Sequence, residues 1–239
     1  MRKTVLITGA AKRLGAALSR SLADQGWEVV LHYNSSRDDA YALSQELKVK
    51  YPDRIFPVLQ CDLSNADADI SLFERLPEGI KELDALINNA STFNTGTIED
   101  TSPGLLRKEM QINFEAPFYL LQSFKNSFER GCIINILDTK ISTNEASHAA
   151  YLLAKKNLAA LTSMAALSFA PDFRVNAVAP GPVLSPPRKN DDYLMGIAEK
   201  TPLKKKVELS DLASSVSFLL NTSSVTGQIL FCDSGLHLL

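Results

Sequence analysis

The feature that most constrains the fold is an alternation of short apolar runs with longer amphipathic ones. Residues 4–8, 12–25 and 28–33 predict a strand, a helix and a second strand in turn. A helix that joins two strands in this way makes a parallel pair. The same alternation continues to the C-terminus. Further strands are expected at 54–61, 84–88, 132–138, 174–178 and 228–232, and further helices at 39–50, 105–128, 151–170 and 211–220. The chain therefore predicts an α/β fold.

Length and composition indicate one domain over residues 1–239, because 239 residues with 45% hydrophobic content can bury one large core. The net charge of −2 is spread over both signs, so nucleic acid is not an expected partner. No apolar run reaches the roughly 18 residues of a membrane span. The three cysteines are an odd number without metal-ligand spacing, which predicts no metal site and fits a reducing cytoplasm.

The turn after the first strand predicts a dinucleotide site. Gly9 allows a tight turn, and Gly15 lets the following helix approach the sheet with its free N–H groups directed at a phosphate. The second strand ends in His32, Tyr33 and Asn34, where NAD-selective sites usually carry an acidic residue. Ser36 and Arg37 follow, and Arg13 stands across the turn. These residues favour a 2′-phosphate and hence NADPH, although Arg37 could equally be a solvated charge at a helix start.

Two further features predict chemistry at the same end of the sheet. Tyr151 and Lys155 are four residues apart, so on a helix they share one face, where the ammonium would favour the phenolate and make the phenol a usable acid. Asp138 ends a buried apolar run, at the strand terminus where open α/β sheets bind ligands. The pair Asp62 and Leu63 follows the third strand, and its carboxylate suits either a helix cap or an adenine amino group.

Several segments together resemble the short-chain dehydrogenase/reductase family. They are the turn of residues 8–15, Asp62-Leu63, Asn88-Asn89-Ala90, Asn113, Tyr151 with Lys155, Pro180-Gly181 and Thr226-Gly227. The resemblance implies a single Rossmann domain with a doubly wound, parallel, seven-stranded sheet in the strand order 3-2-1-4-5-6-7, with helices on both faces, and a homotetramer. It also implies that Tyr151 donates a proton, that Lys155 holds the nicotinamide ribose and lowers the pKa of the tyrosine, and that Asn113 anchors a relay water.

The resemblance also implies a cofactor site. Its expected members are Gly9, Arg13, Leu14, Gly15, His32, Tyr33, Asn34, Ser36, Asp62, Leu63, Asn89, Ala90, Ser91, Lys155, Pro180 and Gly181.

Two departures from the family pattern bear on the substrate. Asp138 stands where the family usually has a serine, and Arg13 replaces the middle glycine of the turn. An ionised carboxylate would oppose a developing oxyanion by roughly 4 kcal/mol at about 4 Å and an effective dielectric of about 20. Reduction of a simple ketone is therefore disfavoured, whereas a C=N substrate that presents N–H groups would be favoured.

Both departures, together with the whole turn 8–15, the pair His32-Tyr33 and the segment 89–93, resemble the pteridine reductase branch of the family. That likeness implies NADPH-dependent reduction of a pterin or folate-type substrate, with Phe93 as one wall of a slot for the flat ring and with Ser91 and Arg13 bonded to both cofactor phosphate and pterin. The substrate set is Arg13, Ser91, Phe93, Asp138 and Tyr151. The chain departs from the branch at Ser35, where an arginine is common, and at Ser234.

Two long-range features complete the predictions. Residues 184–206 are expected to form a substrate lid, and the nearly all-round apolar run 157–170 predicts burial on two sides, one of them against a partner subunit.

Two alternative functions are open from the sequence. The first is another carbonyl, 3-oxoacyl thioester or enoyl reductase of the same family, and the second is an NADP-sensing regulator without turnover. Asn113, Tyr151 and Lys155 argue against the regulator, because binding NADP needs no general acid.

Overall fold

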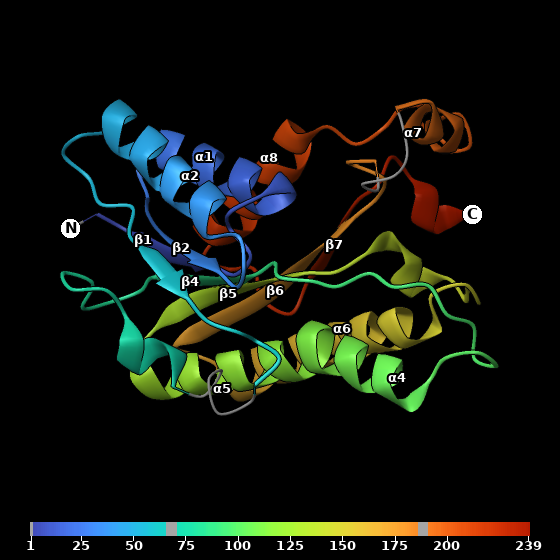
Figure 1. Ribbon diagram of the computed structural model, residues 1–239, viewed down its shortest axis with the longest axis horizontal. Helices are drawn as coiled ribbons and strands as arrows, with labels where there is room; N and C mark the ends of the chain where they lie inside the picture. Colours follow the sequence, from blue (N-terminus) through green and yellow to red (C-terminus); the bar gives the residue numbers. More distant parts are fainter. Residues whose placement is uncertain (1, 66–70, 186–190) are drawn as a thin grey trace.

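The computed structural model describes residues 2–65, 71–185 and 191–239 and has a parallel seven-stranded sheet at its centre (Figure 1). The strand order is β3-β2-β1-β4-β5-β6-β7, which confirms the doubly wound prediction. The strands are β1 Thr4–Ile7, β2 Glu28–Tyr33, β3 Val58–Gln60, β4 Ala85–Asn88, β5 Gly131–Ile136, β6 Phe173–Pro180 and β7 Ile229–Cys232. The order reverses between β1 and β4, and ligands of open α/β sheets bind at such a reversal.

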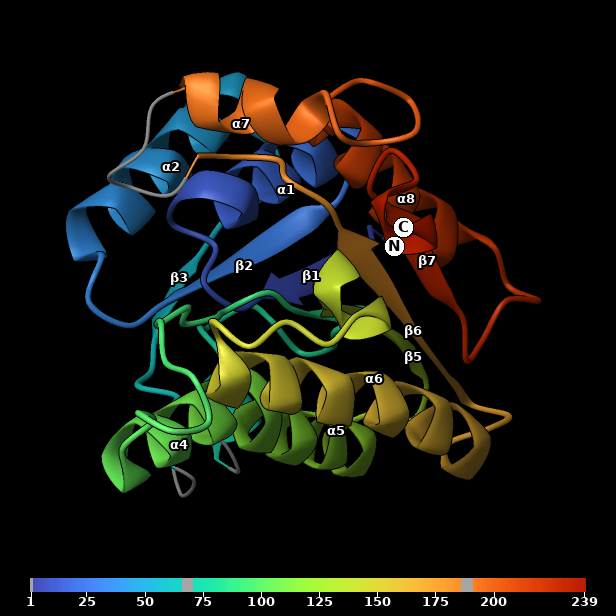
Figure 2. The ribbon, with the colours of Figure 1, turned by 90° about the vertical axis from the view of Figure 1, so that its right-hand side faces the viewer.

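Helices cover both faces of the sheet (Figures 1 and 2). One face carries α1 Arg13–Asp24, α2 Arg37–Lys50 and α8 Leu209–Asn221, and the other carries α4 Pro103–Met110, α5 Ala116–Ser127 and α6 Ala149–Ser168. A further helix, α7 Asp191–Ala198, lies beyond the sheet near the C-terminus. Short 3-10 turns occupy Leu72–Arg75, Thr139–Ser142 and Leu236–Leu238. Within the described ranges, no helix is long and apolar enough to cross a membrane.

The core lies on both faces because successive strand residues point in opposite directions. Val5 and Ile7 of β1 pack into the cluster under α1 and α8, whereas Leu6 between them packs into the cluster under α5. All three side chains are fully buried. A strand buried on both faces reads as a continuous apolar run, and the first strand was predictable for this reason.

Two predicted elements differ most from the structure. The third strand, expected over 54–61, is paired only at Val58–Gln60, because Pro57 has no N–H to donate to the ladder. The helix expected over 105–128 is α4, a π-helical turn Gln111–Glu115, and α5 in succession. Pro117 cannot donate to the carbonyl of Asn113 four residues earlier, which favours this wider turn. The irregularity places Asn113 beside the site.

Candidate active site

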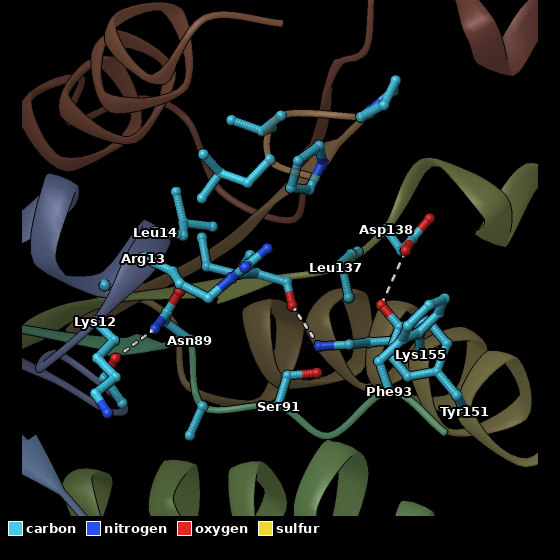
Figure 3. Close-up of a pocket in the computed structure, with 18 of the residues that line it drawn as sticks. Lys12, Arg13, Leu14, Asn89, Ser91, Phe93, Leu137, Asp138, Tyr151 and Lys155 are labelled. Atoms are coloured by element: carbon cyan, nitrogen blue, oxygen red, sulfur yellow. Dashed lines mark hydrogen bonds between the residues drawn. The ribbon is translucent and has the colours of Figure 1, made fainter. Parts of the chain in front are cut away.

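A cavity of about 590 Å³ opens at the carboxyl ends of the central strands (Figure 3). Its volume is within the range of roughly 300–1,000 Å³ found for small-molecule and cofactor sites. Most of the predicted site residues line it, namely Gly9, Arg13, Leu14, Gly15, Tyr33, Asn34, Ser36, Asn89, Ala90, Ser91, Phe93, Asp138, Tyr151, Lys155, Pro180 and Gly181. The sheet therefore brings together residues that are up to 172 positions apart.

The turn between β1 and α1 is built for close approach of the backbone. Gly9 has a φ of 63°, in the left-handed region that favours glycine. A Cβ on Gly15 would lie 2.1 Å from the carbonyl oxygen of Gly9, so only glycine fits there. Lys12 caps α1 without a side-chain hydrogen bond, and residues 11–15 line the cavity. The N–H groups of this helix end are thus placed to receive an anion, as a dinucleotide phosphate requires.

Arg13 occupies the middle glycine position of the turn and keeps the backbone shape of a glycine there. Its φ is 50°, an uncommon conformation for a residue with a side chain. The guanidinium reaches across the cavity and donates to the carbonyl of Ser185 over 3.0 Å. Arg13 therefore adds a positive charge beside the helix terminus and ties the turn to the start of the segment predicted to be the lid.

His32 supports this turn from behind and does not line the cavity. The N–H of Gly9 donates to its Nδ1 over 3.0 Å, and its Nε2 lies 3.1 Å from the carbonyl oxygen of Cys61. Both ring nitrogens are thus used within the protein, with Nε2 as the donor. Burial lowers the pKa of His32 to about 4, so the ring is neutral. The expectation that His32 contacts the cofactor is not supported by this arrangement, which makes it a positioning residue.

Asp62 and Leu63 also lie outside the cavity lining. Asp62 accepts from the backbone N–H of Ser64 over 3.0 Å, which lowers its pKa, and from the amide of Asn34 over 3.1 Å. The contact with Ser64 stabilises the local turn, whereas the two interpretations from the sequence, a helix cap or a contact to the adenine amino group, stay predictions. Leu63 is buried in the core under α5. Asn34 and Ser36 do line the cavity, and Asp62 positions the first of them.

The centre of the site is a hydrogen bond from the Tyr151 hydroxyl to Oδ2 of Asp138, 2.9 Å long (Figure 3). Tyr151 lies in the first turn of α6. Asp138 does not end the strand as expected. Instead, β5 ends at Ile136, and Oδ1 of Asp138 accepts from the N–H of Lys140 over 2.8 Å, capping the turn Thr139–Ser142. The cap fixes one carboxylate oxygen and leaves the other directed at the phenol.

The pKa of Tyr151 moves opposite to the prediction. Burial raises it well above its usual value, and the carboxylate of Asp138 adds to the rise. The Lys155 ammonium does not reverse this, because Nζ is 5.8 Å from the ring centroid and donates to the carbonyl of Ile136 over 2.8 Å. The expectation that Lys155 lowers the tyrosine pKa is therefore wrong for this arrangement. Tyr151 is a protonated phenol at neutral pH and can act as a proton donor.

Lys155 is almost fully enclosed, with 2% of its surface exposed. Burial lowers its pKa to about 8, while the charges of Asp138 and Glu109 oppose the change. Its ammonium faces the cavity from the same side as Tyr151 (Figure 3). The lysine can donate hydrogen bonds there to a polar ligand such as a ribose hydroxyl.

Asn113 lies behind the cavity wall rather than in it. Its Oδ1 accepts from the hydroxyl of Ser91 over 2.6 Å, and its Nδ2 donates to the carboxylate of Glu109 over 2.9 Å. The sequence reasoning missed Glu109, although its position four residues before Asn113 on a helix was the available signal. Asn113 is fully buried, so its expected link to a relay water stays a prediction.

Phe93 lines the cavity next to Tyr151. Its ring contacts Tyr151 edge-on at 4.7 Å and stacks on His148 at 4.0 Å with an interplanar angle of 12°. About half of its surface, 48%, remains exposed. The stacking partner His148 was not predicted. Because His148 covers one face of the ring, Phe93 is held in place with exposed surface left to contact a ligand.

The predicted lid contributes apolar residues to the cavity lining. Leu184, Leu194 and Ile197 line the cavity, the last two from α7. The prolines at 186 and 187 lie outside the described residues. Of the two departures from the pteridine reductase pattern, Ser35 lines the cavity, and Ser234 has a φ of 56°, a conformation more common for glycine.

Fold and site together define an oxidoreductase of the Rossmann type. The chain belongs to the short-chain dehydrogenase/reductase family: the family model described as enoyl-(acyl carrier protein) reductase matches residues 9–237. This confirms the family prediction.

The similar proteins include reductases with two different kinds of name. The structure is similar to that of FolM alternative dihydrofolate reductase 1 from Brucella canis in complex with NADP, with a TM-score of 0.91 and 29% sequence identity. The match covers 99% of the present chain and 95% of the Brucella canis chain. The structure of FolM alternative dihydrofolate reductase 1 from Brucella suis, also in complex with NADP, matches with a TM-score of 0.91 and 28% identity. This match covers 99% of the present chain and 96% of the Brucella suis chain. In sequence, the chain is 27% identical to 3-oxoacyl-[acyl-carrier-protein] reductase FabG of Staphylococcus epidermidis over the full length of both. It is 29% identical to the uncharacterized oxidoreductase YmfI of Bacillus subtilis over 99% of this chain and all of that protein.

Proposed function

We propose that this protein is an NADPH-dependent reductase of a C=N bond in a pterin or folate-type heterocycle. The observation that carries the proposal is the hydrogen bond between Tyr151 and Asp138. A carboxylate at this position repels a developing oxyanion, but it attracts a substrate nitrogen that gains a proton. The cap by Lys140 N–H holds the carboxylate in that position.

The cavity fits a dinucleotide with a 2′-phosphate. The tight contact at Gly15 and the open N-terminus of α1 suit the pyrophosphate. The end of β2 offers Tyr33, Asn34 and Ser36, and no acidic side chain among them. Arg13 adds positive charge at the cavity rim. Both FolM neighbours are complexes with NADP, which supports the same choice.

The chemistry needs one hydride and one proton. NADPH, when bound, supplies the hydride to the carbon of the C=N bond. Tyr151 donates its phenolic proton to the nitrogen, so that the double bond becomes CH–NH. Asp138, already bonded to the hydroxyl, offers a route by which a solvent proton returns to the phenolate. Lys155 would hold the ribose hydroxyls through its ammonium, which faces the cavity.

The walls of the cavity suit a planar ring. Phe93 is held by His148 on one side and keeps exposed surface toward the cavity, so it can stack on a flat heterocycle. The likeness to two alternative dihydrofolate reductases supports a substrate of the folate or pterin class.

A second candidate is reduction of a 3-oxoacyl thioester. The full-length similarity to FabG favours it, since this match covers the complete chains. Asp138 argues against it, because the carbonyl oxygen would develop negative charge beside the carboxylate.

The test is NADPH oxidation by the purified chain with dihydrobiopterin, dihydromonapterin, dihydrofolate or an acetoacetyl thioester. The proposal predicts the highest kcat/KM with one of the three heterocycles. A higher kcat/KM for the thioester would favour the second candidate instead. Tyr151→Phe is the control for site-specific turnover, because it removes the donor without removing the ring.

A further inference from the structure

Glu109 is a buried acid behind the active site. It lies on α4, none of its surface is exposed, and its carboxylate accepts from the amides of Asn94 over 2.5 Å and Asn113 over 2.9 Å. Burying a carboxylate is costly unless both oxygens are hydrogen-bonded, and an ionised carboxylate can only accept. The two amides therefore have to turn their NH₂ groups toward it.

This acid fixes which way the Asn113 amide points. The carbonyl oxygens of Glu109 and Thr92 also lie 3.1 Å from Nδ2, and both of them only accept. The NH₂ end of Asn113 is thus surrounded by acceptors, and its oxygen has to face Ser91. The distance from that oxygen to the Ser91 hydroxyl is 2.6 Å.

The orientation of Asn113 in turn decides the polarity of Ser91. A serine hydroxyl has one proton and two acceptor lone pairs. The Ser91 proton is used on Asn113, with the carbonyl of Thr92 3.2 Å away as a second inward acceptor. Ser91 lines the cavity, and its hydroxyl points toward the side that holds Lys155 and Tyr151 (Figure 3). Only lone pairs are left for a ligand.

We propose that Glu109 is a positioning residue that, through Asn113, makes Ser91 a hydrogen-bond acceptor for an N–H group of the substrate. The inference rests on the proposed function, because a pterin ring presents such N–H groups. It also revises the expected contact between Ser91 and a cofactor phosphate: an ionised phosphate oxygen only accepts, so it does not pair with a hydroxyl whose proton is already used.

A double-mutant cycle on the full chain tests the proposal. Ser91→Ala should raise the KM for the best pterin substrate about 3- to 10-fold, the effect of one neutral hydrogen bond, and leave the Kd for NADPH within about twofold. Glu109→Gln, which replaces one acceptor oxygen by a donor, should raise the same KM to a similar extent. In the Ser91→Ala background, Glu109→Gln should have no further effect on KM. Glu99→Gln, an exposed carboxylate in the preceding segment, is the matched control and should change nothing.

The outcomes separate this inference from the proposed function. If the wild-type chain oxidises NADPH with none of the pterins, the proposed function fails and the substrate named here fails with it. If pterin turnover is present but the two substitutions raise KM independently, Glu109 does not act through Ser91 and the inference alone is overturned. Weaker NADPH binding by Ser91→Ala would also overturn it. Since Ser91 is exposed, its variant tests the proposal even if Glu109→Gln does not fold.

Discussion

The hydroxyl of Tyr151 donates to Oδ2 of Asp138 over 2.9 Å, while Oδ1 of the same carboxylate is held by the N–H of Lys140. The capped oxygen cannot rotate away without breaking the turn Thr139–Ser142, so the other oxygen stays on the phenol. Any proton that Tyr151 passes to a substrate leaves a bond with Asp138. In the proposed reaction, the carboxylate therefore takes part in proton donation together with the phenol.

The loss of the Lys155 proton is expected to set the alkaline limb of the dependence of kcat/KM on pH. Its pKa is lowered to about 8 by burial, whereas that of Tyr151 is raised well above its usual value. As pH rises, Lys155 therefore loses its proton first, and kcat/KM should fall through a pKa near 8. Lys155→Arg, if active, should move that limb to much higher pH, because arginine stays protonated.

Initial rates from about pH 6 to about pH 10 measure this profile, since kcat/KM reports groups of the free enzyme. Lys156→Ala is the control, because the Nζ of Lys156 bonds to Asn144 away from the cavity. A wild-type profile that stays flat through about pH 9 would contradict the assignment to Lys155.

His32 predicts acid sensitivity of the fold. Its pKa is about 4 in the folded chain against 6.5 when unperturbed, so the unfolded chain binds more protons between these values. Its contribution to stability is fully present above about pH 6.5 and is lost as pH falls toward 4. At about pH 4.5 the loss should be about 2–3 kcal/mol.

Urea unfolding of the wild type and His32→Gln at about pH 7 and pH 4.5 checks this value. The glutamine does not titrate, so the variant should lose about 2–3 kcal/mol less than the wild type over this interval. Equal losses would show that His32 takes up its proton without cost in the folded state.

Arg13 predicts the cofactor preference. NADPH should bind at least about tenfold more tightly than NADH, the usual effect of a charge-assisted hydrogen bond to the extra phosphate. Arg13→Gly should reduce this ratio without backbone strain, because glycine adopts the φ of 50° readily. Fluorescence titration measures both constants. Arg20→Ala, which removes an exposed pair with Glu46, is the control, and equal affinities of the wild type for the two cofactors would sink the prediction.

Exposed apolar residues on α5 and α6 predict assembly. Phe118, Leu153, Met164 and Leu167 are 40%, 52%, 68% and 84% exposed, respectively, and the two helices lie side by side (Figure 2). We expect a homotetramer that uses this surface, and light scattering at micromolar concentration should find four times the mass of 26.2 kDa.

The double variant Met164→Glu with Leu167→Glu should reduce this mass, because charges in a buried apolar interface are costly. Val49→Glu alters an exposed apolar residue of α2 and should leave the assembly intact. A wild-type monomer would refute the prediction.

The sequence predicted those features that depend on local pattern. The strand order followed once the βαβ pattern and the family resemblance were recognised, and the residues at strand ends converge because parallel strands end at one edge. Tyr151 and Lys155 share a helix, so their spacing alone predicted their common side.

Features that depend on burial and on long-range contacts were not predictable. The spacing of Tyr151 and Lys155 carries no information on desolvation. The predicted direction of the pKa shift of Tyr151 was wrong for this reason, because burial raises that pKa. The stack of His148 on Phe93 joins residues 55 positions apart in sequence, and the link from Glu109 to Ser91 passes through a π-helical turn. His32 lies next to the last residue of β2, close to the strand end as predicted, but its side chain points into the protein and holds the glycine turn.

The most direct test of the account is the pair of kcat/KM values of Asp138→Ser, for the best pterin and for a small ketone. Serine is smaller than aspartate and its hydroxyl can still cap the turn through Lys140 N–H, so the fold should survive. Pterin turnover should fall by about 10²–10⁴-fold, the usual contribution of a positioned acid or base, and ketone reduction should stay the same or rise. Tyr151→Phe should abolish both. Full pterin activity in Asp138→Ser would contradict the account, because the carboxylate would then take no part in selecting a nitrogen heterocycle.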